Sequence, residues 1–114
     1  MTRYPDLQVY IGGSWRKTKR SQPVLNPADE SVLGEVPLVD QSDLDDALQA
    51  AADGFKVWRK VAPRVRGEIM VKAAALMRER ADEIATSITL EHGKPFPQAK
   101  LEVVRGAEFF EWDA

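Results

Sequence analysis

The feature of this sequence that most limits how it can fold is the stretch 90–95, where one helical pattern stops and another starts. Gly93 can adopt the left-handed backbone conformation that closes a helix, because it has no Cβ atom to clash. Pro95 cannot continue that helix, but its fixed φ angle suits the first turn of a new one. The stretch therefore predicts a sharp connection between two amphipathic helices.

A first helix is predicted after Asp40. Its apolar residues recur at intervals of four and three, which places them on one helical face: Leu44, Leu48, Ala51, Phe55 and Trp58. Asp40 is suited to cap the N-terminus, with Asp43 at the third helical position completing a capping box. The aspartates at this end do not match the spacing of a calcium-binding EF-hand loop, so capping accounts for them.

Further helices are predicted on both sides of the stretch 90–95. Pro63 is expected to open a region that runs to Glu91, with a break near 80–82 where Asp82 caps the second piece. Its apolar face is formed by Ile69, Ala73, Leu76, Met77, Ile84 and Ile88. The helix after Pro95 carries a second apolar stripe, formed by Ala99, Val103, Ala107 and Phe110. Residues 40–114 are therefore predicted to be helical, with three to four helices.

Residues 1–39 are predicted to be rich in β-strand but too thin to bury a core alone. Gly12 and Gly13 lie between β-favouring residues, which indicates a two-residue hairpin turn. A short extended segment that ends in a turn is expected at 23–27. Another strand is expected at 31–39, where glycine and proline restrict it to an edge or irregular position.

The basic run 16–20 has two interpretations, a nucleic-acid or anion-binding patch and a solvated loop or edge strand that charge keeps from aggregating. The edge strand is favoured, because no aromatic residue interleaves with the charges and the net charge of the chain is −2. Nucleic acid is therefore not expected as a partner.

The composition excludes several classes of site. The chain of 114 residues has no cysteine, which excludes disulfides, thiolate metal sites and a cysteine nucleophile within it. No run of about twenty apolar residues could span a membrane, and residues 1–7 lack the apolar core of a signal peptide. A soluble, cytoplasmic protein is the expectation. The last helical turn, 111–114, carries no closing glycine, proline or basic run, so we expect the chain to be a fragment.

Several motifs together resemble the aldehyde dehydrogenase family, in that family's order. They are 10–15 (YIGGSW), 24–28 (VLNPA), the helix 43–58 with its Phe-x-x-Trp end, 63–69 (PxxRGxI), 76–84, and the turn and helix 90–103. Each motif is weak, but six in order across one short chain are specific. The closing residues 109–112 (FFEW) are most similar to the succinate-semialdehyde dehydrogenase branch.

The resemblance implies a parent with an α/β, Rossmann-type fold, of which this chain is the N-terminal portion. Residues 1–114 are then a single partial domain, β-rich over 1–39 and helical over 40–114, leading into a nucleotide-binding domain whose core lies elsewhere. The implied parent oxidises a small aldehyde, such as succinate semialdehyde, to its carboxylate with NAD or NADP, and forms a homo-oligomer. The implied partners are the aldehyde, the cofactor and the remainder of the dehydrogenase fold.

No catalytic, cofactor-binding or metal-binding residue is assigned to this chain, because the family's cysteine, asparagine, glutamate and nucleotide-binding sheet all lie beyond it. The segment alone is expected to be inactive, to bind no cofactor, and to expose apolar helix faces that promote self-association. The alternative is a free-standing helical binding or dimerisation module without catalysis.

Three apparent sites have simpler structural interpretations. His92 lies between Glu91 and Lys94, but residues this close at a helix end diverge, so they are interpreted as helix-end charges or ion-pair partners. Glu102 is expected to pair with Arg105, three residues further along. The tryptophans are interpreted as core or interface anchors: Trp15, Trp58 and Trp112.

Overall fold

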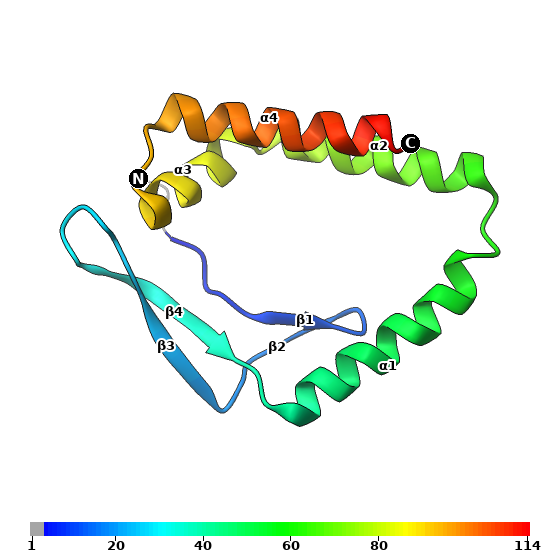
Figure 1. Ribbon diagram of the computed structural model, residues 1–114, viewed down its shortest axis with the longest axis horizontal. Coiled ribbons are helices and arrows are strands. Elements are labelled where there is room, and N and C mark those ends of the chain that lie inside the picture. The colour runs from blue at the N-terminus through cyan, green and yellow to red at the C-terminus, as the bar shows by residue number, and fades with distance from the viewer. Residues whose placement is uncertain (1–3) are drawn as a thin grey trace. The chain divides into compact units, whose positions relative to one another are not determined.

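The computed structural model describes residues 4–114, which form two compact units (Figure 1). The strand-helix unit consists of Tyr4–Leu25 and Val32–Lys60, and the three-helix unit contains Asn26–Ser31 and Val61–Ala114. The described residues hold four short strands followed by four helices, as the sequence predicts.

The strand-helix unit begins with a hairpin of β1 (Val9–Ile11) and β2 (Ser14–Arg16). Gly12 and Gly13 join the strands with φ angles of 59° and 84°, values that favour glycine and that a right-twisted hairpin requires at its turn. Tyr10 lies opposite Trp15, and their ring centroids are 4.9 Å apart. The predicted hairpin is therefore confirmed.

A second antiparallel pair is formed by β3 (Arg20–Leu25) and β4 (Val32–Leu38), with Arg20 opposite Leu38 and an irregularity between Val24 and Leu25. Pro37 lies within β4, which pairs with one strand among the described residues, so its missing N–H is tolerated. Both sheets have two strands, and each is too small to form a core of its own.

Helix α1 (Gln41–Trp58) begins at the predicted capping box. The backbone N–H of Asp43 donates to Asp40 Oδ1 over 3.1 Å, and the N–H of Asp40 donates to Asp43 Oδ2 over 3.2 Å. The helix has no buried residue, and its predicted apolar stripe includes Leu48, which is 70% exposed. The prediction that apolar helix faces are exposed is confirmed on α1.

The three-helix unit contains α2 (Pro63–Glu79), α3 (Ala81–His92) and α4 (Phe96–Trp112), with α4 antiparallel to α2 and packed against both other helices (Figure 1). Small side chains make the buried core: Ala74, Ala81, Ala85, Ala99, Val103 and Ala107. Because alanine lets helix backbones approach closely, this unit needs no large buried side chain. Ile84 and Ile88 pack at its margin.

Salt bridges join the helices at the surface of this unit. Arg78 donates two hydrogen bonds to Glu111, of 3.0 and 2.9 Å, in the bidentate geometry that carboxylates accept from arginine. This contact raises the pKa of Arg78 and lowers that of Glu111. Lys100 on α4 also pairs with Asp82 on α3, at 2.6 Å.

Two details of the sequence prediction are wrong. The helix does break near residue 80, but Arg80 is the capping residue and no side chain caps α3, because Asp82 lies within its first turn and pairs with Lys100. Glu102 pairs with Lys94 instead of Arg105, since the turn before α4 brings the lysine back beside that helix. The turn itself is as predicted, with Gly93 at a φ angle of 80°.

Tryptophan burial also differs in part from the prediction. Trp15 is 68% exposed and Trp112 is 87% exposed, so neither is a core residue among residues 4–114. Trp58 is less exposed, at 38%. Their assignment as interface anchors stays a prediction.

Two glycine-to-alanine substitutions should have opposite effects. Gly93→Ala should lower the free energy of unfolding by about 1–2 kcal/mol, because a Cβ atom strains a left-handed residue. It would also lie 3.1 Å from Pro27 Cγ. Gly54→Ala should raise stability by about 0.5–1 kcal/mol, because Gly54 lies inside α1 and the new methyl group would point into open space beside the helix. Urea unfolding followed by circular dichroism measures the free energy of unfolding of both variants. Equal changes in the two variants would contradict the left-handed conformation assigned to Gly93.

Candidate functional site

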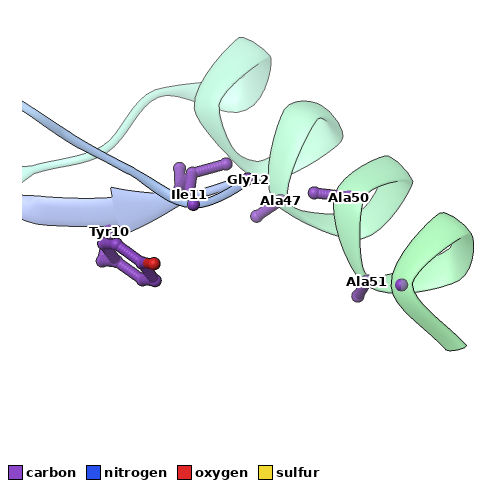
Figure 2. A pocket seen from close by; sticks show the side chains of 8 residues that line it. Tyr10, Ile11, Gly12, Ala47, Ala50 and Ala51 are labelled. Carbon is purple, nitrogen blue, oxygen red and sulfur yellow. The ribbon is translucent and has the colours of Figure 1, made fainter. Parts of the chain in front are cut away.

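A groove in the strand-helix unit lies between the hairpin turn and α1 and has a volume of about 590 Å³ (Figure 2). Its lining is almost entirely small or apolar: Tyr10, Ile11, Gly12, Gly13, Ala47, Ala50, Ala51 and Gly54. The helical members recur at intervals of three and four, so α1 turns one small-residue face toward the turn. This spacing is the sequence signal by which the groove could have been found.

Ile11 is the buried residue of this unit, at 7% exposure, and it lies where the hairpin meets α1. The groove beside it has the Tyr10 hydroxyl as its only ionisable side chain. Such a lining can bury apolar surface, but it offers no charged group to hold a phosphate or carboxylate. The groove is therefore suited to contact with apolar side chains.

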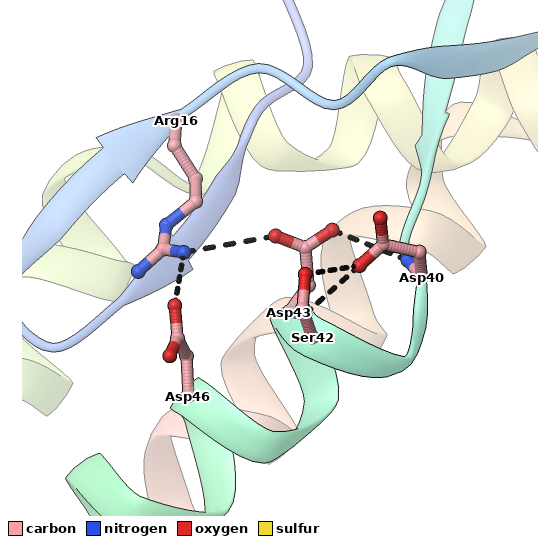
Figure 3. Close-up of polar contacts among 5 residues, drawn as sticks. All are labelled: Arg16, Asp40, Ser42, Asp43 and Asp46. Carbon is pink, nitrogen blue, oxygen red and sulfur yellow. Dashed lines mark hydrogen bonds and ion pairs between the residues drawn. The ribbon is translucent and has the colours of Figure 1, made fainter.

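A charged clamp holds the hairpin to α1 (Figure 3). Arg16 Nη1 lies 2.8 Å from Asp46 Oδ2 and 3.6 Å from Asp43 Oδ1. The hydrogen bond to Asp46 raises the pKa of Arg16. The sequence interpretation of the basic run as a charged strand edge holds for Arg16, which lies in β2, but the clamp joins residues 30 positions apart and was not predicted.

The clamp and the helix cap share one carboxylate. Asp43 accepts the N–H of Asp40 with one oxygen and faces Arg16 with the other (Figure 3). The hydroxyl of Ser42 donates to Asp40 over 2.7 Å, and this bond, with the N–H of Asp43, lowers the pKa of the Asp40 carboxyl. The start of α1 is thus positioned by one connected set of charges.

A second, open surface depression lies along α4 and is lined by Arg105, Glu108, Phe109 and Trp112. These residues share one face of the helix, since they are spaced by three, one and three positions. Phe109 is 71% exposed, so this face presents aromatic rings beside two charged groups. The predicted stripe of α4 divides accordingly, with Val103 and Ala107 buried and Phe110 partly exposed.

His92 and Lys94 lie on either side of the turn at Gly93. His92 ends α3, whereas the amino group of Lys94 pairs with Glu102 on α4 and thereby lowers the pKa of that carboxyl. The interpretation of Lys94 as an ion-pair partner is confirmed.

Within residues 4–114, no group of three or more histidine, cysteine, aspartate or glutamate side chains is placed to hold a metal ion. None of the helices in that range is long and apolar enough to cross a bilayer. What the described residues offer is contact surface, namely the groove, the bare face of α1 and the aromatic face of α4. The described residues therefore form a segment of short strands and amphipathic helices with exposed contact surfaces.

The aldehyde dehydrogenase family has a sequence model that matches residues 15–114, and the chain belongs to that family. A malonate-semialdehyde dehydrogenase of Bacillus subtilis is 40% identical over 116 residues, which cover 100% of this chain and 24% of that protein. The chain spans about a quarter of the length of the curated relatives it matches.

Solved structures agree on the fold. A succinate-semialdehyde dehydrogenase from Burkholderia pseudomallei superposes with a TM-score of 0.89 at 33% identity, over 92% of this chain and 22% of that one. An NADP-dependent glyceraldehyde-3-phosphate dehydrogenase from Bacillus halodurans, complexed with NADP, gives a TM-score of 0.91 at 28% identity, over 94% of this chain and 23% of that one. The short strands followed by helices are therefore the N-terminal portion of the aldehyde dehydrogenase fold.

Acid should loosen the start of α1 through Asp40. Because the pKa of this carboxyl lies below its ordinary value of 3.8 in the folded chain, the cap stabilises fully above that value and is lost as the pH falls through the lowered pKa. An NMR titration should give a midpoint below 3.8, with amide exchange over 41–44 accelerating as Asp40 protonates. Asp40→Asn is the control, because it keeps an acceptor oxygen but cannot titrate. A midpoint at or above 3.8 in the unmodified chain would contradict this role.

Proposed function

We propose that this chain is the leading part of an NAD(P)-dependent aldehyde dehydrogenase that oxidises a small semialdehyde. The observation that carries the proposal is the match of residues 15–114 to the family, together with 40% identity to a malonate-semialdehyde dehydrogenase. The proposed reaction takes an aldehyde, water and NAD(P)⁺ to a carboxylate and NAD(P)H, with release of two protons.

The proposed substrate is an aldehyde that also bears a carboxylate. A relative named for malonate semialdehyde and a solved structure named for succinate semialdehyde support this class. The two compounds differ by one methylene group, and a difference of that size shifts selectivity by only about 1–3 kcal/mol. The proposal is therefore made for the class of short semialdehydes.

This segment has a structural role in the proposed enzyme. Its sequence holds no cysteine that could attack the aldehyde, and no strand, glycine-rich turn and helix that could bind a pyrophosphate. Residues 1–114 are proposed to be the leading part of the nucleotide-binding domain, in a cytoplasmic and homo-oligomeric enzyme. The remainder of the fold would supply nucleophile, oxyanion contacts and nicotinamide site.

A binding module without catalysis is the second candidate. The exposed aromatic face of α4 favours it, because contiguous exposed apolar groups are characteristic of interaction sites. The two candidates differ in what the complete reading frame encodes after Ala114. The mass of the natively expressed protein is therefore the first measurement.

The polypeptide encoded by the complete reading frame should reduce NAD⁺ or NADP⁺ when malonate or succinate semialdehyde is added. Absorbance at 340 nm measures this reduction, and the 114-residue chain should give none. Benzaldehyde, which lacks the carboxylate, is the matched control and should react more slowly. A native protein of 12.8 kDa, or a longer one that oxidises no aldehyde, would contradict the proposal.

A further inference from the structure

The sulfur atoms of this chain belong to methionines, since the sequence has no cysteine. Met1 lies outside the described residues, whereas Met70 and Met77 both lie in α2. The two are seven positions apart, so they share one face of the helix, and both are half-buried. Ala74 lies between them on that face and is completely buried. Both described methionines therefore belong to the inner face of α2.

This inner face packs against α4. The methyl group of Met77 lies 3.1 Å from the position that a Cβ atom on Gly106 would take, so the methionine fills the space that this glycine leaves open. Near the start of α2, Gly67 approaches the backbone carbonyl of Ala114 closely. The α2–α4 seam, as we define it, consists of Met70, Ala74 and Met77 on α2 and Gly106 on α4.

We propose that Met70 and Met77 are oxidation sites, and that a hydroperoxide loosens α4 from α2 by converting their thioethers to sulfoxides. Because both residues are half-buried, a small oxidant can reach them while they still contribute to the seam. Oxidation of methionine is reversible, since sulfoxide reductases restore the thioether. The seam is thus an oxidation-sensitive contact, and it does not depend on the proposed dehydrogenase reaction.

The modification is a two-electron transfer of one oxygen atom to each sulfur. A lone pair of the thioether sulfur attacks the outer oxygen of the hydroperoxide, the O–O bond breaks, and an S=O bond forms. The proton moves to the oxygen that leaves, which departs as an alcohol, or as water when the oxidant is hydrogen peroxide. The sulfur is oxidised and the peroxide is reduced, so the step needs no further reactant.

A sulfoxide fits this seam poorly because it is more polar than the thioether it replaces. Gly106 and Ala74 have no side-chain hydrogen-bond donor, and the backbone N–H groups within the helices are already used. Arg78, which follows Met77, already donates two hydrogen bonds to Glu111. The sulfoxide oxygen must therefore turn to water, which draws the side chain away from α4 and weakens the contact.

The competing interpretation is that the methionines only fill gaps in the packing. The test uses the polypeptide of the complete reading frame, unmodified and with the two substitutions Met70→Leu and Met77→Leu together. Leucine has a similar volume and carries no sulfur. A third form adds Leu76→Met to this double variant, which places a thioether on the outer face of α2, where Leu76 is 47% exposed.

Each form is treated with hydrogen peroxide. Mass spectrometry of its peptides measures the oxygen added to each methionine, and hydrogen exchange measures the opening of the α4 amides. In the unmodified polypeptide, Met70 and Met77 should each gain one oxygen atom. The exchange of the α4 amides should then accelerate roughly tenfold, because an unpartnered polar group weakens the contact. Methionine sulfoxide reductases should restore the original exchange.

The two control forms should keep α4 in place. The double variant should change its α4 exchange by less than about twofold on peroxide treatment, because leucine is not oxidised at the seam. The form with Leu76→Met should be oxidised at residue 76 without acceleration of α4 exchange, because that side chain lies outside the seam.

Oxidation at residue 76 of the third form, while Met70 and Met77 of the unmodified polypeptide stay unoxidised, would overturn the proposal, because the seam would then be closed to the oxidant. Oxidation of both methionines without a change in α4 exchange would also overturn it, since they would then only fill space. Equal acceleration in the double variant would assign the effect to another group. Aldehyde oxidation is not a readout, so the outcome is independent of the proposed function.

Discussion

The close approach of α4 to α2 and α3 is the contact on which the three-helix unit depends. Completely buried alanines line it, including Ala85, Ala99 and Ala107. Since an alanine side chain loses no rotamer freedom on burial, this core forms without the entropic cost of ordering long side chains. The exposed ion pairs, such as Arg78 with Glu111, help to orient the helices, but van der Waals packing of the alanines determines the contact itself.

The large and small apolar residues of the chain lie in different places. Small residues are used where helices or the hairpin approach closely, and large ones, such as Leu48 and Trp112, remain exposed. In a complete globular protein the larger side chains are those that burial stabilises most. The chain reverses this arrangement, and it spans about a quarter of the length of its curated relatives.

Local interactions could be predicted from the sequence, and distant ones could not. The capping box, the Gly12–Gly13 turn and the Gly93 cap each depend on a few neighbouring residues. The Arg16 clamp and the Arg78–Glu111 pair join residues 30 or more positions apart, which no spacing rule reveals. Helical periodicity placed Leu76 on an apolar face, but it could not show that the neighbouring Ala74 would be buried instead. The assignment of no catalytic residue to this segment stays a prediction.

The alanine contacts also determine how closely the helices of the three-helix unit pack. Packed helices lie about 8–10 Å apart depending on the side chains at the contact, and alanines allow the closer approach. Ala107 is completely buried, so an added methylene there would force the packed helices or their neighbouring side chains to shift. A shift of α4 would also move its outer face, which carries Phe109 and Trp112. The position of these aromatic rings therefore depends on the buried alanines on the inner face of the same helix.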